Sequence, residues 1–463
     1  MVFASPTFLF LFLPLFFVGY FSVPSRWRSG WILAGSWLFY GWWRLDFLAL
    51  LVGASLGAGW IGRRIARARS SRSSRRWTVG GVAAALAVLG YFKYFNFGLS
   101  SFVRLLETLG FPEVDPTRFW EVVLPVGISF FTFQIISYLV DVYRGTAQEA
   151  RSLVDVAAYV SLFPQLVAGP IVRYSEIADQ LRERTHSWHG FSAGARRFAL
   201  GMVRKVLIAD AVAPVVVAGF STPEPSFADA WLAVLAYTVQ IYFDFSAYSD
   251  MAIGLGKMMG FRFPENFRRP YHSRSVTEFW RRWHITLSSW LRDYLYIPLG
   301  GNRRGSARTA VNLMTVMVLG GLWHGAAWTF VAWGAWHGGW LMVERLMRTH
   351  GGTPLLLPIF GRLYTMVVVI VGWVFFRAPS FGHGRRLMGG LVDVTSFQVS
   401  SFVGWQLSTG SVVAVLLGMV VISLEPRIFA DGERRPILLG VLFFLAVARL
   451  LAASYSPFLY FQF

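Results

Sequence analysis

The sequence contains no cysteine, and this absence excludes several kinds of chemistry. A chain without thiols forms no disulfide framework, offers no thiolate ligands to a metal and carries no palmitoyl or cysteinyl acyl group. Its histidines do not stand in a metal-binding pattern such as HExxH, so no catalytic metal is expected either. Any covalent chemistry must therefore use another nucleophile or pass directly between two substrates.

Acidic residues are scarce as well. The chain has 24 Asp and Glu residues against 43 Lys and Arg residues, a formal charge of +19. In a soluble protein this balance would suggest nucleic acid, but here the basic residues fill short gaps between apolar runs. The densest gap is Ser-rich and holds Arg63, Arg64, Arg67, Arg69, Arg72, Arg75 and Arg76. The positive-inside rule makes it a cytoplasmic loop that contacts anionic lipid headgroups, and no nucleic-acid partner is expected.

Apolar sequence is what the chain has in excess. Hydrophobic residues make up 55% of it, and the mean hydropathy is +0.50. A membrane helix needs about 20 mostly apolar residues, and stretches of this kind include 7–21, 31–43, 47–61, 79–92, 367–376, 411–424 and 438–453. Backbone groups in lipid must be satisfied within helices or a closed barrel, and the period-2 alternation of barrel strands is absent. The sequence therefore predicts an all-α protein that crosses a membrane many times.

Counting back from the arginine-rich loop sets the orientation. Two helices separate the loop from Arg26 and Arg28, which places these two arginines on the cytoplasmic side, and the first apolar run then places Met1 on the opposite side. The first apolar run has no basic n-region and no small-residue cleavage pattern, so we interpret it as a retained helix rather than a signal peptide.

The chain shows no internal repeat and no segment of soluble-domain size, so we predict one membrane domain over residues 1–463. Residues 1–97 hold plain apolar runs and arginine loops, and residues 348–463 return to plain spanning helices. Between them, residues 98–347 carry Gln, Asp, Asn, His and Arg inside apolar stretches. Polar groups at membrane depth are costly and usually functional, so we expect the chemistry in this central part.

Two prolines interrupt the apolar block 163–171. Pro164 and Pro170 rule out one straight helix here, and broken helices at membrane depth occur where the backbone is buried in protein or lines a cavity. Gln165 lies between the two prolines and is a candidate substrate-binding residue. Earlier in the chain, Pro125 and Gly127 open an aromatic helix.

A polar stripe runs along the predicted helix through 240–250. Helical spacing puts Gln240, Asp244 and Tyr248 on one line, with a second polar line beside it. Such a face either lines a water-filled cavity or makes hydrogen bonds to a neighbouring helix. Asp244 and Tyr248 are candidate tunnel-lining residues under the first interpretation.

The segment 266–305 mixes arginines with tryptophans. Ser275 or Thr277 is placed to cap a helix that runs to about Tyr296, and its apolar stripe predicts an amphipathic helix at the cytoplasmic membrane surface. Guanidinium groups bind phosphates, so an acyl-CoA donor is one expected ligand, and lipid headgroups are the alternative. The candidate substrate-binding residues here are Arg281, Arg282, Trp283, Arg292, Asn302 and Arg303.

Two histidines stand out in this central part. His284 falls inside the predicted interfacial helix, and His324 falls in the apolar run GGLWHGAAW, where Gly and Ala allow the close approach of a neighbour or substrate. A lone histidine in a membrane segment indicates function, because neutral imidazole accepts a proton near pH 7. For His337 on the next helix, and for His272 after a Pro-Tyr turn, we expect structural roles.

Several long segments together resemble one known family. They read LPVGISFFTFQ, FPQLVAGPIVRY, YFDFSAYSDMAIGLGKMMGF, FWRRWHITLSSWLRDYLYIPLGGNR, GLWHGAAWTFVAWGAWHG and GWVFFRA. In this order they resemble the membrane-bound O-acyltransferase superfamily, and most of all its bacterial branch typified by the alginate O-acetyltransferase membrane subunit. The resemblance implies a helical enzyme with roughly 11 transmembrane helices, plus re-entrant or interfacial helices, around a central tunnel.

The resemblance also implies roles for the two histidines. The catalytic histidine of the family's WHG-type motif falls on His324, and the assisting histidine of its WRRWH-type motif falls on His284. The family takes acyl groups from a cytosolic thioester and delivers them toward acceptors outside the cytoplasm, often with a partner acyltransferase in the envelope. Related members move D-alanine toward teichoic acid or acetylate peptidoglycan.

These expectations combine into one hypothesis. Acetyl-CoA, a substrate and not a bound cofactor, docks at the cytoplasmic mouth of an enzyme in the bacterial inner membrane. His324 acts as general base on a hydroxyl of an alginate-like polysaccharide, and His284 orients or polarises the reacting groups. A glycan transporter would show inverted repeats with paired broken helices, and none are visible. A non-catalytic scaffold for polysaccharide secretion is the third interpretation, and the sequence does not identify the acceptor glycan or the partner.

Overall fold

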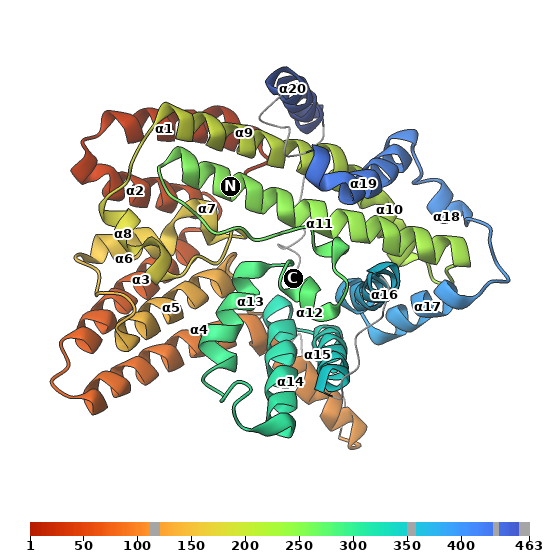
Figure 1. Cartoon of the computed structure of the whole chain (residues 1–463), viewed down its shortest axis with the longest axis horizontal. Helices are drawn as coiled ribbons and strands as arrows, with labels where there is room; N and C mark the ends of the chain where they lie inside the picture. Colours follow the sequence, from red (N-terminus) through yellow and green to blue (C-terminus); the bar gives the residue numbers. More distant parts are fainter. Residues whose placement is uncertain (112–120, 350–357, 429–434, 453–463) are drawn as a thin grey trace. The chain divides into compact units, whose positions relative to one another are not determined.

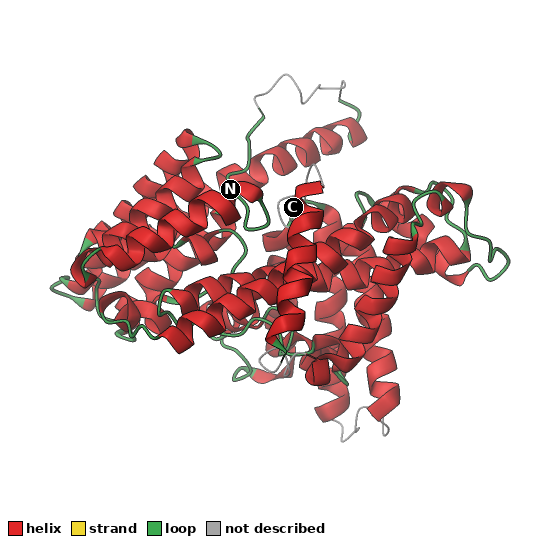
Figure 2. Ribbon diagram, turned by 90° about the horizontal axis from the view of Figure 1, so that it is seen from above, coloured by secondary structure: helices red, strands yellow, loops and turns green. Residues whose placement is uncertain are grey.

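The computed structural model of the chain describes residues 1–111, 121–349, 358–428 and 435–452. Within these ranges every regular element is a helix, and no strand occurs (Figure 2). The all-α prediction is therefore confirmed. The described residues form two compact units, which are treated separately below: Met1 with residues 7–185 and 260–263, and residues 2–6 with 186–259 and 264–463. The further division into three sections with different tasks stays a prediction.

The first unit is a bundle of helices from the N-terminal part of the chain. Its elements are η1 (Thr7–Phe12), α1 (Leu13–Ser22), η2 (Ser25–Trp27), α2 (Arg28–Gly41), α3 (Leu45–Ala66), α4 (Ser71–Thr108), α5 (Ile128–Arg144), α6 (Leu153–Ser161), α7 (Phe163–Leu166) and α8 (Tyr174–Arg182). Helices α3, α4 and α5 pack against one another (Figure 1). Helix α5 is aromatic, begins directly after Gly127 and is almost wholly buried, as the proline and glycine before it predict.

The chain is broken where the two prolines predict it. Helix α6 ends at Ser161, α7 is a single short turn, and residues 167–173 are not helical before α8 begins. The side chain of Gln165 is buried in this break, where its Nε2 donates a hydrogen bond to the carbonyl oxygen of Tyr159 at 2.8 Å. Gln165 therefore has a structural contact within the first unit, and its substrate-binding role stays a prediction.

The second unit is built around the long helix α11 (Phe227–Met258), which is buried along most of its length. The other elements are α9 (Trp188–Arg204), η4 (Lys205–Ala209), α10 (Asp210–Ser221), η5 (Pro270–His272), α12 (Val276–Trp280), α13 (Ile285–Leu291), η6 (Arg292–Tyr296), α14 (Gly305–His324), α15 (Trp328–Thr349), α16 (Pro358–Arg377), α17 (Phe381–Val392), α18 (Ser401–Gly404), α19 (Thr409–Ile428) and α20 (Pro436–Ala452). Helices α9 and α10 pack along α11, and α14 lies beside α15 (Figure 1).

The polar stripe of α11 makes ion pairs with its neighbours in the second unit. Asp244 Oδ1 lies 2.7 Å from Lys205 Nζ in η4. Asp250 binds two arginines of α9, with Oδ1 at 2.9 Å from Arg197 Nη2 and Oδ2 at 2.7 Å from Arg204 Nη1. The carboxylates of this stripe therefore connect helices, which is the second of the two interpretations. Tyr248 is also buried, with its ring stacked on that of Phe3 at 4.5 Å.

Three of the described helices are long and apolar enough to cross a membrane, namely Leu45–Ala66, Ser71–Thr108 and Ile359–Arg377. Shorter apolar helices cover Thr7–Ser22, Thr409–Leu424 and Pro436–Ala452. Their presence supports a multi-pass membrane protein. The total of roughly 11 transmembrane helices stays a prediction, because length and composition alone do not reach it.

Candidate active site

The predicted interfacial helix from Ser275 to Tyr296 is wrong. Ser275 does cap a helix, since its hydroxyl accepts a hydrogen bond from the Glu278 backbone N–H at 3.0 Å. That helix, α12, ends at Trp280, and α13 begins only at Ile285. Between them, His284 takes the left-handed conformation, with φ 43° and ψ 54°. A non-glycine residue in this region costs about 1–2 kcal/mol, and such strain is typical of functional positions.

Tertiary contacts hold this break in place. The backbone N–H of Ile285 donates to the Asn266 carbonyl, and the N–H of Arg268 donates to the Arg282 carbonyl, both at 2.9 Å. The strand-like segment 266–268 therefore pairs with the turn at 282–285. A helical periodicity in sequence cannot reveal a break of this kind, because its cause is a partner segment outside the helix.

The N-terminus of α12 is fixed by a buried carboxylate. Glu344 of α15 accepts hydrogen bonds from the backbone N–H groups of Val276 (2.5 Å) and Thr277 (2.9 Å). It also accepts the Thr277 hydroxyl at 2.6 Å. A carboxylate at a helix N-terminus satisfies N–H groups that have no partner inside the helix. Glu344 thus anchors the element that leads to His284.

His284 is fully buried in the second unit. Its Nδ1 lies 3.1 Å from Asn266 Oδ1, which also receives hydrogen bonds from the backbone N–H (3.3 Å) and the hydroxyl (2.9 Å) of Thr286. The imidazole lies against Phe245 of α11, with ring centres 4.6 Å apart. Among the described residues, its Nε2 has no hydrogen-bond partner.

His324 is the last residue of helix α14. Gly325 follows it in extended conformation, and the chain then turns into α15. A side chain at Gly325 would place its Cβ 2.0 Å from the ring of Phe330, so only glycine fits in this turn. His324 is 3% exposed, and its ring lies 5.1 Å from Trp333 and 5.2 Å from Phe376.

The structure brings the two histidines together, as the sequence predicts. The centres of the His284 and His324 rings are 6.2 Å apart. Trp323 lies beside both rings, at 5.9 Å from His284 and 5.1 Å from His324. The pair is therefore an adjacent set of two imidazoles in an aromatic enclosure, which limits access of water.

His337 belongs to the same aromatic cluster. It is fully buried on α15, and its ring lies 5.2 Å from those of Trp280 and Trp333. Neither ring nitrogen has a hydrogen-bond partner among the residues that the structure describes. A Cβ at Gly372 of α16 would lie 2.6 Å from its Nε2, so the histidine fills the gap between α15 and α16. This packing fits the structural role expected for it.

The other candidates from the basic segment differ among themselves. Trp283 is buried and stacks on Phe279 at 5.6 Å. Arg282 is ion-paired with Glu278, and Arg292 is bound by Asp293, whose hydrogen bonds raise the pKa of Arg292. Arg292 is exposed, as are Arg281, Asn302 and Arg303. Among the described residues, no hydrogen bond or ion pair connects any of these five arginine and asparagine side chains to either histidine, so their substrate-binding roles stay predictions.

Sequence analysis missed Asn266. It stands 18 residues before His284, and only the fold brings them together. The sequence did contain an indication of its role. A side-chain amide in an apolar aromatic segment needs a hydrogen-bond partner when it is buried.

Comparison with known proteins identifies the family of the chain. Residues 147–381 match the membrane-bound O-acyltransferase family, and both histidines fall within the match. The chain belongs to this family, in the branch of alginate O-acetyltransferases, and it is an O-acyltransferase. It is 45% identical to the probable alginate O-acetylase AlgI of Pseudomonas putida over 100% of both chains.

Two more distant relatives act on other acceptors, according to their names. The chain is 36% identical to the peptidoglycan O-acetyltransferase of Helicobacter pylori, over 85% of this chain and 80% of that protein. It is 26% identical to the teichoic acid D-alanyltransferase of Bacillus subtilis, over 56% of this chain and 70% of that protein.

Proposed function

We propose that this chain transfers an acetyl group from cytosolic acetyl-CoA to hydroxyls of an alginate-like polysaccharide outside the cytoplasm, directly or through an envelope partner. The observation that carries the proposal is the buried pair His284 and His324 in a chain whose full length aligns with alginate O-acetylases. The peptidoglycan and D-alanyl relatives align over less of the chain and at lower identity, so transfer to those acceptors is the second candidate.

The chemistry assigned to His324 is general-base catalysis. The imidazole takes the proton of the acceptor hydroxyl while the hydroxyl oxygen attacks the thioester carbonyl. The C–O bond forms, the C–S bond breaks, and the departing CoA thiolate receives the proton from the imidazolium. A positioned base of this kind contributes about 10²–10⁴-fold to the rate. The enclosing rings of Trp333 and Phe376 support this role because they exclude water that would hydrolyse the thioester.

The proposed setting is the inner membrane of a bacterium. The structure places most of the arginine-rich segment 63–76 in the end of α3 and the start of α4, so the predicted loop is limited to residues 67–70. In the proposed topology this segment and the basic segment around Arg281 face the cytoplasm, where the acyl donor is made, and Met1 lies on the other side. Asp244 and Tyr248 are proposed to line the acceptor path.

The test is acetyl transfer by purified protein carrying His324→Ala. We expect a loss of more than about 100-fold in transfer from radiolabelled acetyl-CoA to oligosaccharide, with unchanged amounts of protein in the membrane. His189→Ala is the matched control, because His189 is exposed on α9 and should leave the rate unchanged. Near-normal transfer by His324→Ala would refute the proposed base. Failure of the wild-type protein to consume acetyl-CoA would favour the transporter or scaffold interpretation.

A further inference from the structure

The hydrogen bonds around Asn266 determine which nitrogen of His284 carries the proton. A backbone N–H can only donate, and the Thr286 N–H points at the Asn266 side chain at 3.3 Å. The atom that it meets must therefore be the carbonyl oxygen Oδ1 and not the amide nitrogen. The His284 Nδ1 faces the same oxygen at 3.1 Å, so this Nδ1 must be the donor.

We infer that Asn266 is a positioning residue that fixes neutral His284 with its proton on Nδ1, which makes Nε2 the second proton acceptor of the site beside His324. In this tautomer the only N–H of His284 is already used on Asn266. The residue then has no donor with which to polarise the thioester carbonyl, which is one of the two roles expected for it. This inference rests on the proposed function. It assigns His284 the role of orienting the acceptor hydroxyl, whose proton its Nε2 can accept.

The geometry of the pair agrees with this assignment. An imidazole nitrogen lies about 1.2 Å from its ring centre, so rings 6.2 Å apart keep their nitrogens at least about 3.8 Å from each other, beyond hydrogen-bond distance. This lower bound leaves room for one hydroxyl oxygen to contact a nitrogen of each ring. The hydroxyl proton moves to an imidazole as the C–O bond forms, and it leaves with the thiol as the C–S bond breaks.

Two substitutions separate this role from simple packing. Asn266→Leu removes the acceptor for Nδ1, frees the ring to take the other tautomer, and should lower kcat by roughly 10- to 100-fold at unchanged KM. Asn266→Asp keeps an acceptor and adds a negative charge, which stabilises the imidazolium. Because a base must be deprotonated to act, the acidic limb of the pH–kcat profile should then move to higher pH by roughly one unit.

Asn312→Leu is the matched control. Asn312 is an equally buried asparagine of the same unit, and it donates to the Gly301 carbonyl at 2.9 Å without touching either histidine. It should leave the shape of the pH profile unchanged even if stability falls. An unshifted profile in Asn266→Asp, or wild-type kcat in Asn266→Leu, would overturn the inference.

A second readout does not depend on activity. Nitrogen NMR of ¹⁵N-histidine-labelled protein shows which ring nitrogen carries a proton, with the His284 signal assigned by its loss in His284→Ala. We expect a protonated Nδ1 in the wild type and a mixture in Asn266→Leu. A His284 protonated on Nε2 would refute the tautomer assignment, whereas inactivity of the wild type with acetyl-CoA would refute only the proposed function.

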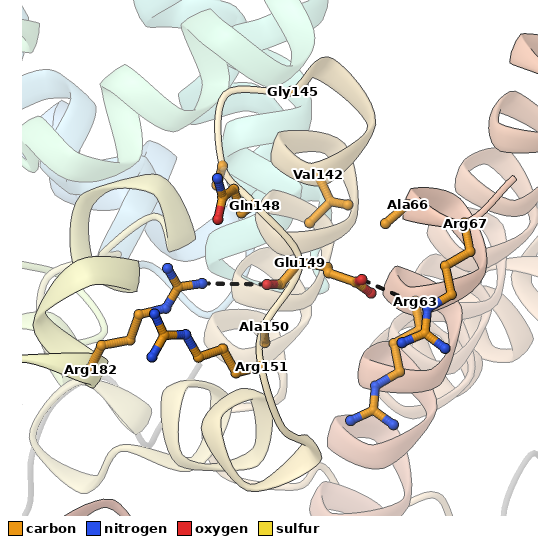
Figure 3. A pocket seen from close by; sticks show the side chains of 11 residues that line it. Arg63, Ala66, Arg67, Val142, Gly145, Gln148, Glu149, Ala150, Arg151 and Arg182 are labelled. Atoms are coloured by element: carbon orange, nitrogen blue, oxygen red, sulfur yellow. Dashed lines mark hydrogen bonds and ion pairs between the residues drawn. The ribbon is translucent and has the colours of Figure 1, made fainter.

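A different observation, in the first unit, carries a second inference. Four arginines line a cavity of about 570 Å³ formed by the end of α3, the loop after α5 and the end of α8 (Figure 3). Glu149 is the only carboxylate among the residues that line the cavity, and its Oε1 lies 3.8 Å from Arg67 Nε. Arg182 Nη2 donates a hydrogen bond to the backbone carbonyl oxygen of Glu149 at 3.5 Å. The side chains of Arg63 and Arg151 form no hydrogen bond or ion pair with another described residue.

We propose that this arginine-lined cavity, formed by Arg63, Arg67, Arg151 and Arg182, binds a phosphate group. Guanidinium forks match phosphate oxygens, and a cavity of this volume is within the range of small-molecule sites. One carboxylate does not neutralise four guanidinium groups. The phosphate belongs either to an anionic lipid headgroup or to the nucleotide part of CoA, and the experiment distinguishes these sources.

The test is thermal unfolding of the purified full chain with phosphatidylglycerol, phosphatidylcholine, CoA or dephospho-CoA. A ligand that binds the folded state raises the unfolding midpoint. We expect Arg63→Gln with Arg151→Gln to lose at least half of the stabilisation. Arg69→Gln with Arg72→Gln should keep it, because these two arginines are exposed between the end of α3 and the first turn of α4 and do not line the cavity. A response to phosphatidylglycerol identifies a lipid, and one to CoA but not dephospho-CoA identifies the donor. Equal losses in both double variants, or no stabilisation by any anion, would overturn the proposal.

Discussion

One methyl group added between α14 and α15 should disable the enzyme. Gly321 lies one turn before His324, and a Cβ built there would be 2.2 Å from the backbone carbonyl oxygen of Phe330 in α15. Real Cβ atoms essentially never approach another atom within 3.0 Å, so the two backbones must separate by at least about 0.8 Å. No side-chain rotation relieves this contact, because both sides of it are fixed by the helix backbone.

The displacement falls on His324, the proposed general base. Phe330 packs its ring against Gly325 and Phe376, the residues that follow and enclose His324. A misplacement of about 1 Å costs roughly 100-fold in rate, and overpacking costs about 1–3 kcal/mol of stability. We therefore expect Gly321→Ala to lower kcat by one to two orders of magnitude and to lower the midpoint of thermal unfolding.

The chain offers a control with the opposite sign. Gly339 is a helical glycine of α15, and a Cβ built there would have no atom within 4 Å. Replacing a helical glycine that has this space with alanine favours the helix by about 0.5–1 kcal/mol. Gly339→Ala should therefore leave acetyl transfer unchanged and stabilise the protein slightly. The reasoning is refuted if Gly321→Ala keeps most of its activity, or if both variants lose activity to the same extent.

Two further predictions concern buried carboxylates. Glu344→Ala should leave the N–H groups of Val276 and Thr277 without their acceptor and destabilise the protein by about 1–3 kcal/mol, whereas Glu344→Gln should recover part of this loss; chemical or thermal unfolding measures both. If Glu344→Ala unfolds like the wild type, the anchor role of this residue is wrong. Lys205→Met removes the cation that is ion-paired with buried Asp244 and with Asp210, at a cost of about 3–5 kcal/mol, and Lys205→Met with Asp244→Asn should be more stable than the single variant. A double variant less stable than Lys205→Met would contradict the ion-pair assignment.

Run length and residue type predict the helical class and the membrane setting, but they do not determine how many helices span the membrane. Helix α11 has 32 residues, yet its mean hydropathy is lowered by polar residues such as Gln240 and Asp244. Length and hydropathy therefore identify α3 and α16 as candidate membrane spans, whereas they do not identify helices that carry polar groups, such as α11. The partners of those groups lie on other elements, such as Lys205 in η4, and spacing along one helix cannot identify them.

The candidate site shows the same division between local and tertiary information. The histidines were predictable because an imidazole in an apolar segment is costly without a purpose. The break at His284 was not, because the apolar periodicity continues through it and the cause is the pairing of segment 266–268 with the turn. Asn266 was missed for the same reason, since its importance depends on contacts made through the fold.

The distribution of backbone strain connects Asn266 to both the fold and the chemistry. Among the described residues, the only non-glycine residues with positive φ are Arg269, which directly follows the paired segment 266–268, and His284, which lies in the turn at 282–285. Each costs about 1–2 kcal/mol, which the backbone pairs of Asn266 with Ile285 and of Arg268 with Arg282 help to offset. Replacement of the Asn266 side chain has two effects at once. It removes a hydrogen-bond contact of the strained residue His284, and it removes the group that determines the tautomer of His284. A loss of rate alone therefore cannot separate these two effects, whereas a shifted pH profile in Asn266→Asp can, because a carboxylate preserves the contact and changes only the charge.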